Sequence, residues 1–162
     1  MRAFASYLAR VHESLSMAKK LITINIDPII EARVDTKTPH YWDAKRRRVL
    51  RGSDEDSGSG RTVLIDTIPA RTLRKLITDF RKIVDSKDQK QVDEVLKAGL
   101  DRFPKLLEKE PQLASTWRKQ AGRTLAQSAV DWLALQGIEN FTPSGSMSRF
   151  LHGKSKARDE EE

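Results

Sequence analysis

The densest charge in this chain is a run of four cations closely followed by a fifth: Lys45, Arg46, Arg47, Arg48 and Arg51. Adjacent cations repel one another and are almost never fully buried without partners, so the run belongs on a solvated loop or against an anionic partner. Trp42 lies three residues before the run. A ring beside cations could stack on bases while the cations contact phosphates. The alternative is that Trp42 anchors the loop in the core and the arginines face water.

A second group of cations falls in a segment with helical periodicity. From Pro69 to Val84 apolar residues recur at the spacing of one helix face, which predicts an amphipathic helix. The remaining positions carry Arg71, Arg74, Lys75, Arg81 and Lys82. This basic face could follow a phosphate backbone, or it could equally be a surface that faces water. A shorter cationic patch, Trp117–Lys119 with Arg123, lies further along the chain.

Residues suited to catalysis or metal binding are sparse. The chain has no cysteine, and its three histidines, His12, His40 and His152, fall in unrelated segments. The spacings of metalloprotease, nucleotide-binding and hydrolase motifs are absent. Residues 153–155 match only the end of a phosphate-binding loop, because position 148 holds Ser148 where that loop requires glycine. We therefore expect a non-enzymatic protein with no metal and no cofactor.

The composition favours an anionic partner. Among 162 residues, 30 Lys and Arg against 23 Asp and Glu give a net charge of +7, which favours nucleic acid first and an acidic membrane surface second. No apolar run approaches the ~20 residues that span a bilayer, and the N-terminus lacks the apolar stretch of a secretory signal. The lack of cysteine fits a reducing compartment. These features predict a cytoplasmic protein with no membrane partner.

The first part of the chain has the pattern of short strands. Residues 21–27 alternate apolar and polar side chains up to Pro28, which predicts a half-buried strand. Residues 29–34 fit a second strand or one helical turn, and the basic run is at most an edge strand. Residues 52–60 hold three glycines, three serines and three acids and predict a flexible linker before a strand at 61–68. We expect the strands at 21–27 and 61–68 to pair, so that the basic run and the linker project from them.

The second part of the chain has the pattern of helices. After the helix at 69–84, a second helix begins near Ser86, whose spacing to Gln89 suits a capping box, and it ends or bends at Phe103. A short turn at 105–109 and a long helix from Pro111 to Gln136 follow, the latter capped by Gly137. Residues 142–146 are predicted to be a loop, 147–152 a further turn and 153–162 a charged tail.

These elements predict an α+β fold in four segments. Residues 1–16 form an amphipathic extension, 17–68 a small β element of two to four short strands, 69–137 a bundle of three main helices, and 138–162 a loop and tail. The extension fits a short packed helix, an organelle-targeting peptide, or an over-long start that precedes the natural one at Met17.

The order strand, helix, helix over residues 61–103 resembles the ribbon–helix–helix DNA-binding fold, although Val63, Leu64 and Ile65 leave the strand without a polar face. This order favours DNA over RNA, and we do not assign the chain to that family. We expect a non-enzymatic, basic nucleic-acid-binding accessory protein that acts as an oligomer or within a nucleoprotein complex. The alternative is a helical adaptor or structural subunit of an assembly, with the helix that carries Trp117 and Trp132 as its contact surface.

Overall fold

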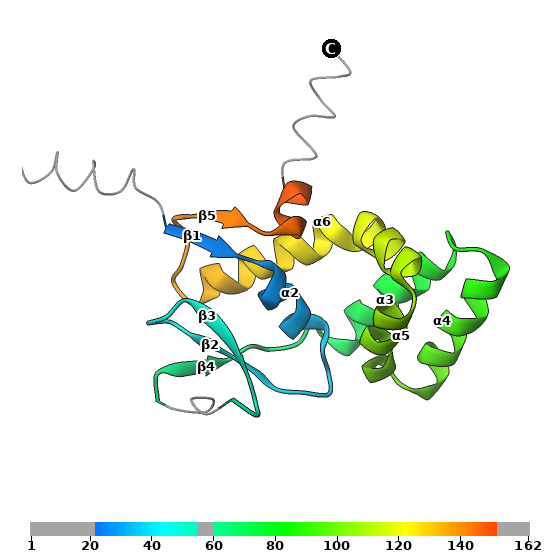
Figure 1. The fold of residues 1–162 in the computed structure, drawn as a ribbon, viewed down its shortest axis with the longest axis horizontal. Coiled ribbons are helices and arrows are strands. Elements are labelled where there is room, and N and C mark those ends of the chain that lie inside the picture. Colours follow the sequence, from blue (N-terminus) through cyan, green and yellow to red (C-terminus); the bar gives the residue numbers. More distant parts are fainter. Residues whose placement is uncertain (1–21, 55–59, 152–162) are drawn as a thin grey trace, which may run out of the picture.

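The computed structural model describes residues 22–54 and 60–151, and it confirms the α+β class (Figure 1). The elements in chain order are β1 (Ile22–Asn25), α2 (Asp27–Val34), β2 (His40–Asp43), β3 (Arg48–Arg51), β4 (Thr62–Leu64), α3 (Ala70–Arg81), α4 (Ser86–Ala98), the 3₁₀ turn η1 (Leu100–Arg102), α5 (Phe103–Lys109), α6 (Pro111–Leu135), β5 (Phe141–Ser144) and the 3₁₀ turn η2 (Ser146–Ser148). Strands therefore predominate early and helices later. The predicted extension at 1–16, the middle of the linker and the tail at 153–162 lie outside the described residues.

The three-stranded antiparallel sheet has the order β3-β2-β4. In its register Asp43 faces Arg48 across β2 and β3, and Trp42 faces Val63 across β2 and β4. The segment with the basic run thus ends in an edge strand, as predicted. The strand predicted at 61–68 is present only at Thr62–Leu64. It pairs with β2 and not with β1, so the predicted pairing of the two flanking strands was wrong.

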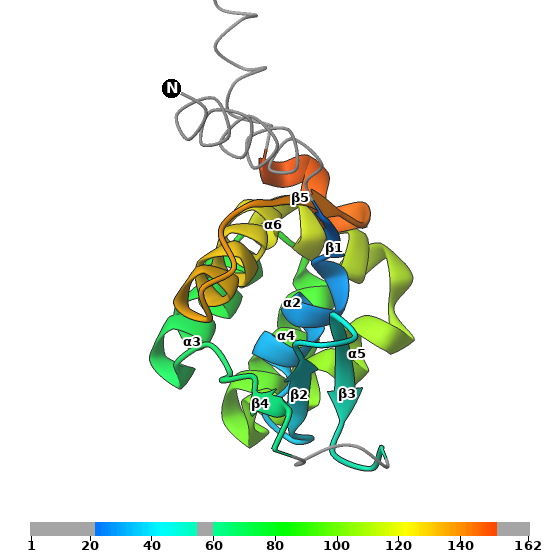
Figure 2. The same cartoon turned by 90° about the vertical axis from the view of Figure 1, so that its left-hand side faces the viewer.

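The partner of β1 is β5, 119 positions away between Ile22 and Phe141, in a two-stranded parallel sheet. The predicted loop at 142–146 was therefore wrong for its first three residues. Pro143 hid this strand in the sequence, but proline is tolerated in an edge strand, where its missing N–H leaves no ladder bond unmade. Figure 2 shows β5 beside β1, with α6 close behind them.

The β1–β5 pair is tied to the helices that follow by Asp27. Its Oδ2 accepts hydrogen bonds from the N–H and the hydroxyl of Ser146, both at 2.8 Å, and its Oδ1 accepts one from the N–H of Met147 at 2.9 Å. One carboxylate at the first residue of α2 thus binds the first two N–H groups of η2. Of the two alternatives for residues 29–34, the structure shows the helix, which has Pro28 in its first turn and Ile29, Ile30 and Ala32 buried.

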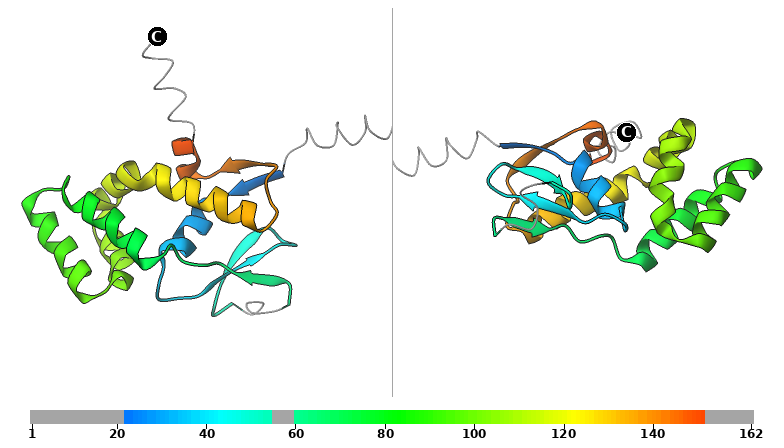
Figure 3. Two further views of the ribbon diagram at one scale, coloured as in Figure 1. Left: turned by 180° about the vertical axis from the view of Figure 1, so that it is seen from behind. Right: turned by 60° about the horizontal axis from the view of Figure 1, so that its bottom comes forward.

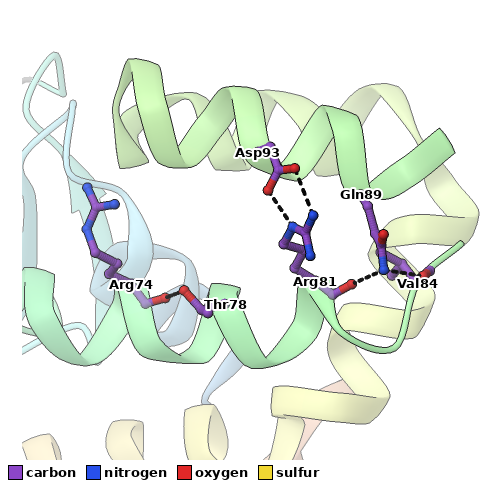
Figure 4. Close-up of polar contacts among 6 residues, drawn as sticks. All are labelled: Arg74, Thr78, Arg81, Val84, Gln89 and Asp93. Atoms are coloured by element: carbon purple, nitrogen blue, oxygen red, sulfur yellow. Dashed lines mark hydrogen bonds and ion pairs between the residues drawn. The ribbon is translucent and has the colours of Figure 1, made fainter. Parts of the chain in front are cut away.

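The helix α4 begins at Ser86 as predicted, but its cap and its end differ from the prediction. Its cap is Asp85, whose side chain accepts from the N–H of Asp88 at 2.9 Å. Gln89 does not reach back to a cap. It donates to the carbonyls of Arg81 and Val84 (Figure 4). Gly99, at φ 143°, ends the helix before the predicted Phe103, because that conformation is accessible to glycine alone at little cost.

The long helix α6 confirms the prediction within a residue. Gly137 has φ 83°, and the N–H groups of Gly137 and Ile138 bond to the carbonyls of Ala134 and Leu133, which is the Schellman arrangement. The core under this helix contains edge-to-face rings of Phe80, Phe103 and Trp117, with centroids 4.7–6.1 Å apart. Strands and helices share a single hydrophobic core, so the basic surfaces are carried by one packed body.

Candidate nucleic-acid interface

The basic run forms the tip of the β2–β3 hairpin, which we call the hairpin tip (Lys45–Arg48). Residues 44–47 make the turn, and Asp43 holds it: its Oδ1 accepts from the N–H of Lys45 at 3.0 Å and of Arg46 at 3.1 Å. These bonds, the Arg46 one above all, lower the pKa of Asp43. Asp43 is buried, whereas all four cations of the tip are exposed.

The cations of the basic run differ in backbone conformation, in ion pairing and in position. Arg47 has φ 53°, a left-handed conformation that asparagine or glycine would adopt more readily. The Nε of Arg46 lies 3.8 Å from Asp43 Oδ2, with 51% of the Arg46 side chain exposed. Arg51 stands at the far end of β3, where it faces His40 in the register. Four of the five predicted cations therefore gather at the tip, and Arg51 is about 10 Å along the strand from Arg48.

Trp42 corrects one expectation, because only 1% of it is exposed. Trp42 belongs to the hydrophobic core, so its ring is not on the surface to stack on a base. The alternative, in which Trp42 anchors the hairpin, is the one the structure shows. The sequence could have indicated this burial, because neighbouring side chains of a strand alternate. Once His40–Asp43 is a strand, Tyr41 and Trp42 must point to opposite faces.

The cations of α3 divide into two faces, and two of them contact α4. The contact of Arg81 is drawn in Figure 4. The guanidinium of Arg81 binds both carboxylate oxygens of Asp93, with Nη2 3.0 Å from Oδ2. This ion pair raises the pKa of Arg81 and lowers that of Asp93. Nη1 of Arg74 donates to the carbonyl of Leu96 at 3.0 Å. Arg74 and Arg81 thus join α3 to α4, and the contacts proposed below use the other three cations of α3.

The other three cations of α3 point to solvent. Positions 71, 75 and 82 follow the helical repeat on the exposed side. Lys75 and Lys82 each lie 3.7 Å from a carboxylate oxygen of Asp79, but these are exposed pairs, which contribute little and exchange readily with other anions. Arg71 forms no ion pair within the described residues.

The hairpin tip and the exposed face of α3 do not form one continuous patch. Thr62 faces Asp43 beside the tip, and the chain then runs away from it through β4 and residues 65–69 to Ala70. The eight steps of chain from Thr62 to Ala70 therefore separate these two residues by at most about 26–29 Å. Both elements are visible from the same side in Figure 3 (left), with the connecting segment between them.

Two features are absent from the part of the chain that the structure describes. It holds no group of three or more His, Asp or Glu side chains placed to bind a metal ion. None of its helices combines the length and the apolar composition needed to cross a bilayer.

Comparison with known proteins gave no match: no family model, no curated protein and no solved structure is similar to this chain. The resemblance of residues 61–103 to ribbon–helix–helix proteins thus gains no support, and β4 pairs within its own chain. The function has to be argued from the chain's own surfaces.

Proposed function

We propose that this protein is a non-enzymatic nucleic-acid-binding accessory protein whose hairpin tip contacts backbone phosphates. The observation that carries the proposal is the buried Asp43, which fixes the turn through two backbone N–H groups while four cations remain exposed on it. A fixed turn loses little conformational freedom on binding, which favours affinity. Burying an acid to hold a row of cations outward has no evident benefit for the core.

The net charge of +7 supports the same proposal, because a basic protein attracts polyanions over a distance set by ionic strength. Arg71, Lys75 and Lys82 supply further cations on the exposed face of α3. We propose DNA ahead of RNA as the ligand, action as an oligomer or within a nucleoprotein complex, and the cytoplasm as the compartment.

An adaptor would need a contact surface other than the predicted face of Trp117 and Trp132. Trp117 and Trp132 are 3% and 2% exposed, so they stabilise the core and cannot form the predicted docking face. The observation that now favours an adaptor is the apolar edge of β4, where Val63 and Leu64 are 42% and 50% exposed. A strand edge of this kind can pair with a partner strand.

Electrophoretic mobility shifts with duplex and single-stranded probes across a salt series test the proposal. We expect binding at low salt that weakens steeply as salt rises. The absence of any shift at low salt, or affinity unchanged in Arg46, Arg47 and Arg48→Ala, would refute it. A chain that binds no probe but elutes as an assembly with a protein partner would support the adaptor.

A further inference from the structure

A groove of about 680 Å³ lies between α3 and α6, with the end of α2 and the segment before α3 at its floor. We call it the α3–α6 groove. Its polar lining comes mostly from groups that can donate hydrogen bonds, and the members used below are Arg33, Thr72, Arg123, Thr124, Ser128 and Asp131. Its volume falls within the range of small-ligand sites.

Arg33 from α2 is the cation of the floor. Its Nε and Nη2 donate to the Ser128 hydroxyl at 3.2 and 3.1 Å, and its Nη1 donates to the carbonyl of Asp66 at 2.7 Å. Among the described residues no carboxylate forms an ion pair with it. A guanidinium has five N–H groups. Three of those of Arg33 make these hydrogen bonds, so two remain available to a ligand. Burial lowers the pKa of Arg33, and the charges of Asp66 and Asp131 offset this in part. A bound anion would add to that compensation.

Besides Ser128 and Gln127, the walls of the groove carry one cation, two hydroxyls and one acid. Arg123 and Thr124 lie on α6 and Thr72 lies on α3. Asp131 is the opposing charge, and it already accepts a hydrogen bond from the side chain of Gln127 at 2.8 Å. With Arg33 and Arg123 against Asp131, the lining remains cationic by one charge.

We propose that the α3–α6 groove binds a phosphate group of the nucleic-acid strand whose backbone the hairpin tip also contacts. The identity of the ligand as nucleic acid rests on the proposed function above. The phosphate chemistry rests on the groove itself, since unspent guanidinium N–H groups and hydroxyls are the donors that phosphate oxygens take.

The helices α3 and α6, whose residues line the groove, and the β2–β3 hairpin are all visible from the same side of the molecule (Figure 3, left). Since Thr62 to Ala70 spans at most about 26–29 Å, one strand could contact both. On a duplex with a 3.4 Å rise this upper limit corresponds to about eight base pairs. Probes of twelve or more nucleotides are therefore long enough to contact both sites.

Variants that change the charge of the groove in opposite directions give the sharpest test. Arg123→Gln keeps an exposed helix-forming residue and should weaken binding of a twelve-nucleotide single strand about fivefold. It should also reduce the salt slope by about 0.7. Asp131→Asn removes the repulsive charge and should tighten binding about twofold to threefold. Lys90→Gln, on the exposed face of α4, removes one charge elsewhere and is the matched control. Equal effects of Arg123→Gln and Lys90→Gln, or weaker binding by Asp131→Asn, would overturn the proposal.

A trinucleotide separates this proposal from the hairpin. Titration of the Arg46, Arg47 and Arg48→Ala variant, followed by amide chemical shifts, should still move the signals of Thr72 and Thr124. If they do not move in either this variant or the wild type, the groove proposal fails while the hairpin proposal stands. Inorganic phosphate and phosphatidylserine vesicles are the comparison ligands. Shifts with vesicles but none with the trinucleotide would refute nucleic acid as the source of the phosphate.

Discussion

Replacing the three arginines of the hairpin tip by alanine gives a measurable change in the salt dependence of binding. On B-DNA each neutralised phosphate contributes about 0.9 to the slope of log K against log salt. Arg47 and Arg48 are exposed, whereas Arg46 has Asp43 within 3.8 Å and is already partly compensated. We therefore expect the slope to fall by about 1.8 if two arginines count and by about 2.7 if all three do.

These slopes predict a clear change in relative affinity. Between 50 and 200 mM salt, the ratio of wild-type to variant affinity should shrink by about 12-fold for the smaller slope and about 40-fold for the larger. Fluorescence anisotropy with a labelled 16-base-pair duplex measures both proteins over this range. Because the substituted side chains are exposed, the urea midpoint should remain within experimental error of the wild type.

The matched control removes the same charge from another place. Lys87, Lys90 and Lys97→Ala lowers the net charge by three on the exposed face of α4, and alanine is favourable in a helix. If binding depends on net charge alone, this variant and the hairpin variant will lose the same slope. That result would refute the reasoning that the fixed turn is the contact.

Three further predictions follow from the geometry. Asp43→Ala should loosen the hairpin tip, with faster amide exchange at the two following N–H groups and several-fold weaker duplex binding, while Asp43→Asn keeps the acceptor oxygen and should retain both. Burial lowers the pKa of His40. The contribution of His40 to the free energy of unfolding should therefore be fully present above the unfolded-state pKa of about 6.5 and decline as pH falls below it. Urea midpoints at pH 7.5 and 5.5 should differ in the wild type, and they should differ less in His40→Phe. Gly145, at φ 100° and ψ 167°, is in a conformation that only glycine adopts freely, so Gly145→Ala should cost about 1–3 kcal/mol from backbone strain. Contact of the added methyl with the side chains of Asn25 and Asp27 should add to this cost. Gly137→Ala, at φ 83° with no atom near its added methyl, should lose only the backbone cost in the same urea titration.

The elements with a strong local period were predictable from the sequence. The α+β class, the basic edge strand and the helix from Pro111 with its Gly137 cap follow from periodicity and capping chemistry. The start of α4 at Ser86 was also predicted, but its cap was not. Asp85 and Ser86 are both capable caps, and the choice between them depends on the geometry of the preceding turn.

Strand pairing was the part that local patterns could not supply. The partner of β1 lies near the other end of the described chain, and nothing in either segment encodes that distance. A four-residue strand that contains Pro143 resembles a loop by every local measure. What fixes it is long-range: Asp27 binds Ser146 and Met147 across 119 and 120 positions, and such contacts exist only once the core has formed.

The roles of the arginines show how far the candidate site could be predicted. The composition does not distinguish one arginine from another. In the structure Arg47 is exposed on a fixed turn, Arg81 binds Asp93, and Arg33 lies at the floor of a groove. Periodicity could have separated some of them. Positions 74 and 81 are seven residues apart and flank the apolar stripe of α3, where a neighbouring helix must pack, whereas 71, 75 and 82 lie opposite it. A cation beside the stripe finds a partner on the next helix, and a cation opposite the stripe remains for a ligand. The helical position of a basic residue therefore carries more information about binding than the number of basic residues in the segment.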